Sequence, residues 1–313
     1  MLNTKNFTDL IPYILRSVPY IHQSHTCKAY CALEHLYASK SHLSDEVWHH
    51  CTSIIREDEP KVDGLIIPEL LEMDQVVDQT SGRNFGPDWI LGRGLMPLSY
   101  WAMQKKVKQT SFAAVMQEYI EKSLDKTRYL GHEISVLSAY WQFYQEVIVN
   151  TTEVESHNLF LQRFTEFVTA TYTHGEGDVV EHPPIDKVPS EEEILYHALC
   201  NPGFFGHHVL AHVWGTRLKS LLSEDQVQLM HHSQMMLIRG TSLEESATPL
   251  QPLDKVWSEE VLDENLTQFF LEGPHNIHQI TLAEALVWCW SHYPQYRGLV
   301  AANLQCFTDR VRQ

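Results

Sequence analysis

The sequence predicts an all-α protein, a single domain of about ten helices that spans residues 1–313. Apolar residues recur at helical spacing along most of the chain. Several of these runs begin with a serine followed by acidic residues, which is typical of a helix start. Alternating β-branched runs between hairpin turns, which would indicate strands, are missing. The 313 residues suffice for a sizeable core, and no fixed-length repeat indicates a solenoid.

The expected helices follow one another from His25 to the end of the chain. "LSDEVWHHCTSIIRE" begins with a Ser-Asp cap, "SEEEILYHAL" begins with a serine cap, and "SEDQVQLMHHSQMMLIRG" ends at a glycine. The expected helices cover 25–39, 43–57, 111–125, 133–149, 158–173, 190–199, 206–222, 223–240, 281–293 and 296–312. The expected loops, rich in Gly, Pro and acidic residues, are 58–68, 78–98, 173–190, 241–257 and 272–277.

Composition excludes several classes of protein. The net charge of −17 argues against a general binder of nucleic acid or anionic membranes, because those proteins need basic surfaces. Six cysteines without a C-x-x-C pair are expected to be buried free thiols. The N-terminus lacks the features of a signal peptide, and no apolar stretch reaches the roughly 18 residues of a membrane span. A reducing cytoplasm is the expected location.

Common catalytic motifs are missing from the chain. It contains no P-loop, no G-x-G-x-x-G after a strand, no G-x-S-x-G, no H-E-x-x-H and no His-Asp dipeptide. A di-iron carboxylate site needs two Glu-x-x-His pairs on facing helices, and only Glu46–His49 lies in an expected helix. The chemistry therefore has to come from another constellation.

Histidine is the unusual residue, with nineteen in the chain. The stretch "GHHVLAHVWGTRLKSLL" (206–222) begins with a doubled histidine. A pattern of His, any residue, Ile or Leu and then a small residue occurs at His208, His132 and His278, each time in the first turn of an apolar helix. This pattern makes His208 the recurring position, and it leaves His207 as a surface or cap residue.

Four helices led by histidines could bring four imidazoles to one end of a helix bundle. The predicted metal ligands are His25, which opens another small-residue helix, and His132, His208 and His278. Neutral imidazole suits Fe, Zn, Cu and Ni, whereas Mg and Ca prefer oxygen ligands. The alternative is that these histidines are structural, each half-buried and hydrogen-bonded in its own first turn.

The same segments resemble the questin oxidase-like family. "SHTCKAYCALEHLYAS" (24–39) is similar to a family region in which a histidine precedes a small-residue helix and an L-Y-x-L-G-A-like turn, with Ser39 where the family has Gly-Ala. "HVLAHVWGTRLKSLL" (208–222) keeps the family's histidine and places Arg217 at the matching distance, but has Ala211 in place of a threonine.

The third resemblance lies near the C-terminus. "HQITLAEAL" (278–286) is similar to the family's H-x-I-K followed by L-x-E-A, with Thr281 in the lysine position. "GHEISVLSAY" (131–140) resembles the remaining histidine-led helix. The resemblance implies an all-helical oxidase or oxygenase of polycyclic aromatic or quinone-type metabolites. It also implies a non-haem iron held by histidines and a modified lysine.

Three further residues are candidates for catalysis. Lys28, one turn after His25, could replace the lysine that Thr281 removes; the alternative is a surface lysine that snorkels. His212 lies one turn after His208 and is a candidate acid, base or hydrogen-bond donor to a metal ligand. Arg217 is a candidate site residue, with an ion pair to an acidic neighbour as the alternative.

These observations favour a non-haem Fe(II) enzyme that oxidises an aromatic intermediate of secondary metabolism with O₂. Its partners would be a small aromatic substrate and O₂, with neither nucleic acid nor membrane, and the chemistry leaves open an external reductant such as NADPH. Two alternatives remain. One is a non-catalytic helical binding protein with structural histidines, and the other is a zinc-dependent hydrolase that uses the same ligands.

Overall fold

The computed structural model describes residues 7–18, 25–62, 86–124, 129–173, 187–240, 248–254 and 257–309. Within these ranges the chain forms fourteen α-helices and no strand, so the all-α prediction is confirmed and the helix number is higher than expected. The predicted loops 58–68, 78–98, 173–190 and 241–257 lie partly outside the described residues.

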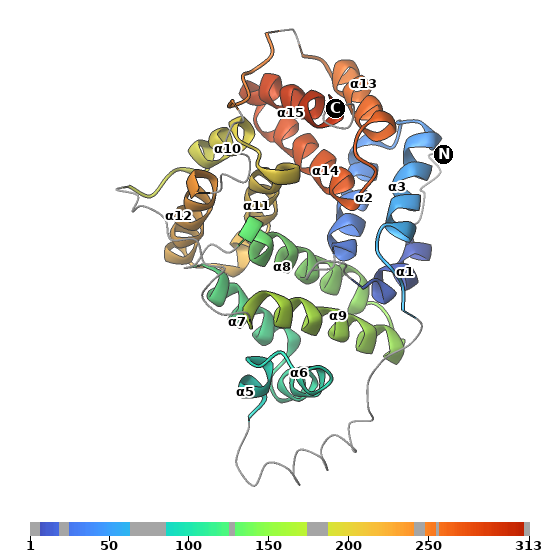
Figure 1. The fold of residues 1–313 in the computed structure, drawn as a ribbon, viewed down its shortest axis with the longest axis vertical. Helices are drawn as coiled ribbons and strands as arrows, with labels where there is room; N and C mark the ends of the chain where they lie inside the picture. The colour runs from blue at the N-terminus through green and yellow to red at the C-terminus, as the bar shows by residue number, and fades with distance from the viewer. Residues whose placement is uncertain are drawn as a thin grey trace.

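The helices are short to medium in length (Figure 1). Their bounds are α1 Ile11–Arg16, α2 Thr26–Lys40, α3 Asp45–Glu57, α5 Pro87–Leu91, α6 Leu98–Gln109, α7 Phe112–Leu124, α8 His132–Phe143, α9 Val154–Tyr172, α10 Glu191–Cys200, α11 His207–Thr216, α12 Glu224–Gly240, α13 Glu259–Glu272, α14 Ile277–His292 and α15 Arg297–Asp309.

Four of these helices, α1, α5, α6 and α13, were not expected from the sequence. The helices α1 and α5 have only six and five residues, too few to show a helical period. The helix α13 begins with a clear signal, because the Ser258 side chain accepts a hydrogen bond from the Val261 N–H and two glutamates follow it. The helix expected over 206–222 ends at Thr216, before a separate 3₁₀ turn.

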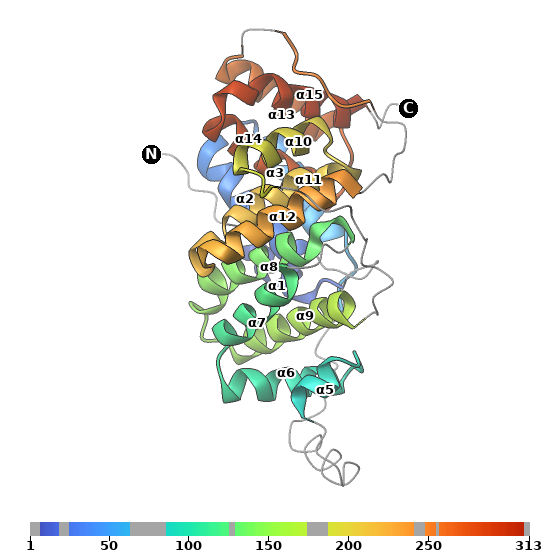
Figure 2. The same cartoon turned by 90° about the vertical axis from the view of Figure 1, so that its left-hand side faces the viewer.

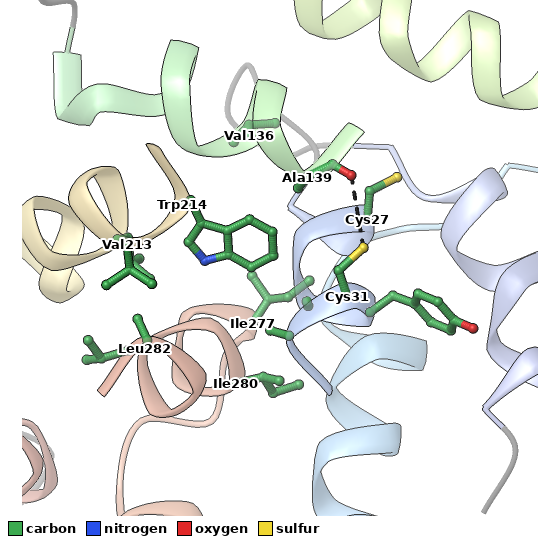
Figure 3. Close-up of a cluster of buried hydrophobic side chains, with 14 of the residues drawn as sticks. Cys27, Cys31, Val136, Ala139, Val213, Trp214, Ile277, Ile280 and Leu282 are labelled. Carbon is green, nitrogen blue, oxygen red and sulfur yellow. Dashed lines mark hydrogen bonds between the residues drawn. The ribbon is translucent and has the colours of Figure 1, made fainter. Parts of the chain in front are cut away.

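The centre of the molecule is a ring of four helices, α2, α8, α11 and α14. Each one packs against two others, in the order α2, α8, α11, α14 and back to α2. Trp214 of α11 fills the middle of this central ring and is fully buried, with Cys31, Ala139 and Ile277 from the other three helices around it (Figure 3). Each of the four helices also buries a small residue, which allows close packing: Ala32, Ala139, Ala211 and Ala285.

Most of the other helices pack around the central ring, while α6 packs on α7 and α9, and α5 packs on α6. The long axis has α5 and α6 at one end and α13 and α15 at the other (Figure 2). The helices α10 and α12 pack on α11, and α7 packs on α8. Five of the six cysteines are buried and all six are free, as predicted. Among the described helices, none combines the length and the apolarity that a membrane span requires.

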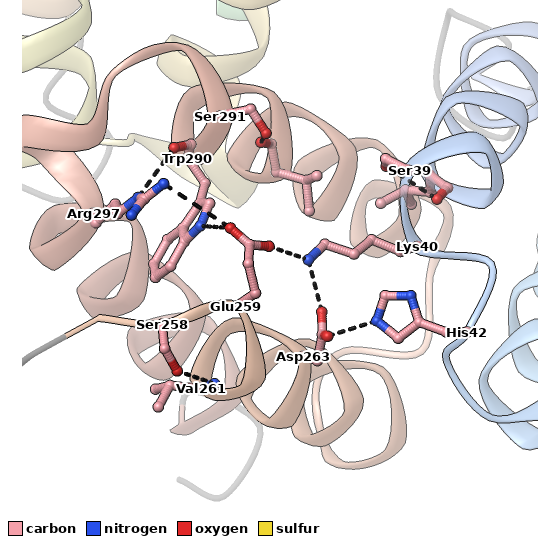
Figure 4. Close-up of polar contacts among 12 residues, drawn as sticks. Ser39, Lys40, His42, Ser258, Glu259, Val261, Asp263, Trp290, Ser291 and Arg297 are labelled. Atoms are coloured by element: carbon pink, nitrogen blue, oxygen red, sulfur yellow. Dashed lines mark hydrogen bonds and ion pairs between the residues drawn. The ribbon is translucent and has the colours of Figure 1, made fainter.

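A polar network holds α13 against the central ring (Figure 4). Lys40 is the last residue of α2, and its buried Nζ lies 2.7 Å from Glu259 Oε2 and 2.7 Å from Asp263 Oδ1. The indole N–H of Trp290, on α14, donates to Glu259 Oε1 over 2.7 Å. One lysine thus joins two carboxylates of α13 to the end of a central helix.

Candidate metal centre

Four imidazoles converge where the first turns of the central helices meet. The group consists of His25, His132, His207 and His278, and one ligand atom from each lies within 4.8 Å of the others. His132 Nε2 is 3.0 Å from His25 Nε2 and 2.9 Å from His207 Nε2. His278 completes the group, with its ring centroid 4.8 Å from that of His25 and 5.0 Å from that of His207. We call these four residues the histidine cluster.

The backbone before α8 and α11 explains why two of these histidines point inward. Leu130 and Gly131 both have positive φ, 63° and 65°, and Phe205 and Gly206 have 46° and 76°. This double left-handed turn makes the next residue, a histidine in both cases, the first residue of its helix. Glycine adopts this conformation without steric cost.

The other two histidines also lie at helix starts. His25 is the N-cap of α2. His278 is the second residue of α14, and its N–H donates to the Asn276 side chain over 3.0 Å. The four histidines therefore occupy three different positions, an N-cap, a first residue and a second residue, so a single sequence pattern cannot align them.

The predicted grouping needs one correction, because His207 takes the place expected for His208. His208 is one residue further along the helix, which turns its side chain by about 100°. Its Nδ1 lies 2.5 Å from the Asn201 carbonyl oxygen, and its ring packs against Gly203. His208 thus anchors the turn between α10 and α11. The Gly-His pairs at 131–132 and 206–207 were the sequence signal for the correct residue.

Electrostatics keep three members of the cluster neutral. Burial lowers the pKa of His132, His207 and His278 well below the usual value, and neighbouring imidazoles lower it further. The Nδ1–H of His207 donates to the Phe204 carbonyl, which leaves a lone pair on its Nε2. These three members thus present neutral ligand atoms rather than charged imidazolium groups.

Hydrogen bonds alone do not account for this convergence. A neutral imidazole nitrogen offers one directed site, either an N–H or a lone pair. His132 Nε2 faces two other Nε2 atoms at hydrogen-bond distance and can pair well with only one of them. A metal ion at the centre would accept a lone pair from every member. The cluster can therefore hold a metal ion, and it consists of the ligands that transition metals prefer.

Lys28 lies inside the central ring, so the alternative of a snorkelling surface lysine is wrong. Only 1 % of this residue is exposed. Burial lowers the pKa of Lys28 to about 7, and the Arg217 charge acts in the same direction, while Glu284 opposes it. Its charge also lowers the pKa of the cluster's His132, His207 and His278. Within the described part of the chain, its Nζ has the Trp214 ring as neighbour, 5.7 Å from the centroid.

The remaining predicted site residues lie away from the cluster. His212 shares the face of His208, and its Nδ1 is 3.3 Å from the amide oxygen of Gln234 on α12; burial lowers its pKa to about 4. Arg217 forms an ion pair with Glu284, which confirms the alternative of an acidic partner. Thr281 Oγ1 donates to the His278 carbonyl within the helix. The structure thus brings neither His212 nor Arg217 to the cluster.

Comparisons with known proteins supply no relative. The chain matches no protein-family model, no curated protein and no solved structure. The chemistry of the site therefore rests on its four imidazoles, on the distances between them and on the groups that surround them.

Proposed function

We propose that the protein is a metal-dependent oxidoreductase whose histidine cluster holds a divalent first-row transition ion, with Fe(II) as the leading choice. Its substrate would be an aromatic intermediate of secondary metabolism and its oxidant O₂. The spacing of the cluster nitrogens is the observation that carries the metal part of this proposal. The resemblance to the questin oxidase-like family supports the oxidative chemistry and the aromatic substrate.

The two nitrogen–nitrogen spacings measured from His132 Nε2 fit ligands at right angles. With metal–nitrogen bonds of about 2.1 Å, two ligands at 90° lie about 3.0 Å apart, whereas tetrahedral ligands lie about 3.4 Å apart. The distances from His132 Nε2 are 3.0 and 2.9 Å. An octahedral set contains ligands at right angles, and four imidazoles in such a set would leave two positions for exogenous molecules. A closed tetrahedral zinc site would leave none.

The charge around the cluster favours an electron-rich molecule at those open positions. All four imidazoles come from helix starts, where the helix dipole is positive. The group consists of histidines alone, so its four ligands would not neutralise the charge of a divalent ion. An anion or a reducible molecule such as O₂ would complete the site. Bound iron would supply the electron transfer to O₂ that no side chain here can provide.

Lys28 is the group to which we assign proton transfer. It lies one turn from His25 in a buried position, and its pKa of about 7 allows both the amine and the ammonium form at neutral pH. Its Nζ would give a proton to a ligand at the cluster or accept one from it. Thr281 provides no amine, so Lys28 is the candidate for the role of the family's lysine.

Metal analysis of protein purified without a histidine tag tests the proposal. We expect one equivalent of iron, lost in His207→Ala and His278→Ala but kept in His49→Ala, which changes an exposed histidine of α3. Substitution with Co²⁺ should give weak visible bands, because five- and six-coordinate cobalt absorbs far less than tetrahedral cobalt. Bound zinc with intense tetrahedral cobalt bands would contradict the proposal, because a closed site of four histidines leaves no position for O₂. An absence of stoichiometric metal would overturn the proposal.

A further inference from the structure

A pocket of about 490 Å³ opens at the other end of the central ring. Its lining includes His35 near the end of α2, Gln142 near the end of α8, Trp288 of α14 and Arg217 just after α11. The first turns of these same helices carry the histidine cluster. The four helices therefore run in the same direction, from the cluster to the pocket.

Helix geometry separates the pocket from the cluster. Glu284 follows His278 by six residues and Arg217 follows His207 by ten, which correspond to about 9 and 15 Å along an α-helix. The buried Trp214 ring fills the core between the two, with the Arg217 guanidinium 3.9 Å from its centroid. A molecule in the pocket would thus not touch a metal held by the cluster.

Four buried polar atoms of the pocket residues have no hydrogen-bond partner within the described part of the chain. They are Ser138 Oγ, Gln142 Oε1, Arg217 Nη1 and Glu284 Oε2. Ser138 and Glu284 are only 1 % and 4 % exposed. Buried polar groups in native proteins are almost always paired with protein, water or a ligand, so these four atoms are the positions at which a molecule in the pocket would form hydrogen bonds.

The chemistry of these atoms defines what that molecule must offer. Burial alone would raise the pKa of Glu284, but Arg217 and His35 outweigh it and hold the pKa below its usual value. Its Oε1 faces Arg217 Nη2 and, at 3.4 Å, His35 Nδ1, which leaves Oε2 as an acceptor for a ligand. Gln142 Oε1 is a second acceptor. The ligand must therefore provide at least two N–H or O–H donors, and one acceptor for Arg217.

The walls of the pocket and the balance of its charges restrict the shape and the charge of the ligand. Trp141 and Trp288 line the pocket with aromatic rings, and His292 stacks on Trp288 with centroids 4.3 Å apart. The charges of Arg217 and Glu284 cancel, so an ionic ligand gains no net attraction. The last turns of four helices also give this end a negative potential, which favours hydrogen-bond donors.

We propose that this pocket binds a flat, uncharged aromatic molecule that carries hydroxyl or N–H donors, at a site distinct from the metal centre. The volume lies within the roughly 300–1,000 Å³ of small-molecule sites. The inference does not depend on the proposed function, because every group that carries it lies outside the histidine cluster.

Equilibrium dialysis of the full chain against matched naphthalenes tests the ligand class. We expect 2,6-dihydroxynaphthalene to bind at least tenfold more tightly than 2,6-dimethoxynaphthalene, which has the same rings but no donors. The anionic 2-naphthoate should bind more weakly than the diol. Equal binding of the diol and the dimethoxy compound, or tightest binding of the naphthoate, would overturn the proposal.

Paired variants test the place of binding. Ser138→Ala and Gln142→Ala should each weaken diol binding about 3- to 10-fold, the effect of one lost hydrogen bond. Ser135→Ala, which removes another unpaired buried hydroxyl of α8, should leave it unchanged. Gln268→Ala is the control for Gln142, because both glutamines donate to a glutamate four residues on.

His207→Ala separates this proposal from the metal centre. Diol binding should persist in this variant even though its metal site is broken. Loss of binding in His207→Ala, or unchanged binding in both pocket variants, would show that the diol does not occupy this pocket. Thermal melting of each variant identifies any that fails to fold, and the Ser138 hydroxyl deletion is small enough to leave a folded protein for the decisive comparison.

Discussion

The doubled histidine at 207–208 allows a test in which two adjacent alanine substitutions should have different effects. His207→Ala removes one Nε2 from the histidine cluster. Apparent binding free energies of four-ligand zinc sites are about 10–16 kcal/mol, or about 2.5–4 kcal/mol for each ligand. Metal affinity should therefore fall about 10²- to 10³-fold, since 1.36 kcal/mol corresponds to a factor of ten.

His208→Ala should instead reduce stability and leave the metal in place. It deletes a buried imidazole and the partner of the Asn201 carbonyl oxygen, 2.5 Å from His208 Nδ1. An unpaired buried carbonyl costs about 1–3 kcal/mol, and the cavity adds to this cost. We expect the free energy of unfolding to fall by about 2–4 kcal/mol, with metal affinity changed by less than about threefold, because no ligand is lost.

Competition against a chromophoric chelator measures metal affinity, and urea unfolding of metal-free protein measures stability. His49→Ala, at an exposed position of α3, is the control for loss of an imidazole as such. If His208→Ala lost the metal and His207→Ala kept it, the arrangement of the first turn of α11 described above would be refuted. The pattern of histidine, apolar and small residues would then be the better guide to the ligands.

Three further predictions concern stability. In metal-free protein, burial keeps the pKa of His132, His207 and His278 well below the usual value, so below about pH 6.5 only the unfolded chain takes up their protons. These three protons alone should lower the free energy of unfolding by about 4 kcal/mol per pH unit on the acid side. Urea titrations measure this slope, and a flat acid limb would contradict the prediction. Gly206→Ala places a Cβ 2.5 Å from Leu282 Cδ1 on a residue with φ of 76°, and it should lower the free energy of unfolding by about 2–4 kcal/mol in thermal melts. Gly86→Ala is the control: its Cβ meets no atom within 4 Å, so its stability should be close to that of the parent protein. Lys40→Met removes the buried lysine that two carboxylates of α13 share and should lower the free energy of unfolding by about 1–3 kcal/mol. Faster proteolysis of α13 would report this loss, and an unchanged rate would mean that the network contributes little.

Helix starts were the part of the site that sequence could predict. Three of the four converging imidazoles, His25, His132 and His278, were found because each precedes an apolar, small-residue helix. The fourth was displaced by one residue, because the left-handed turn at Phe205 and Gly206 sets where α11 begins. Backbone conformation of this kind is encoded by a glycine and its surroundings, not by the apolar pattern that follows it.

Long-range partners could not be predicted. Arg217 and Glu284 are 67 residues apart in sequence and meet only because α11 packs against α14. The burial of Lys28 likewise depends on three other helices closing around α2. The helix α13, by contrast, had a readable Ser258 cap and could have been predicted, whereas five- and six-residue helices such as α5 and α1 carry too little periodicity.

The parallel arrangement of the central ring explains both why its ligands are widely spaced in sequence and why the two ends of the ring differ in chemistry. Parallel neighbours need long connections, so His25 and His132 are 107 residues apart and His132 and His207 are 75 apart. Four positive helix ends then meet at the cluster, where neutral imidazoles and an electron-rich ligand are favoured. Four negative ends meet at the pocket, where Arg217 and a donor-bearing ligand are favoured. The parallel arrangement of the four helices therefore predicts opposite ligand preferences at the two ends of the ring. An anion such as azide should bind at the metal-loaded cluster without displacing an aromatic diol from the pocket.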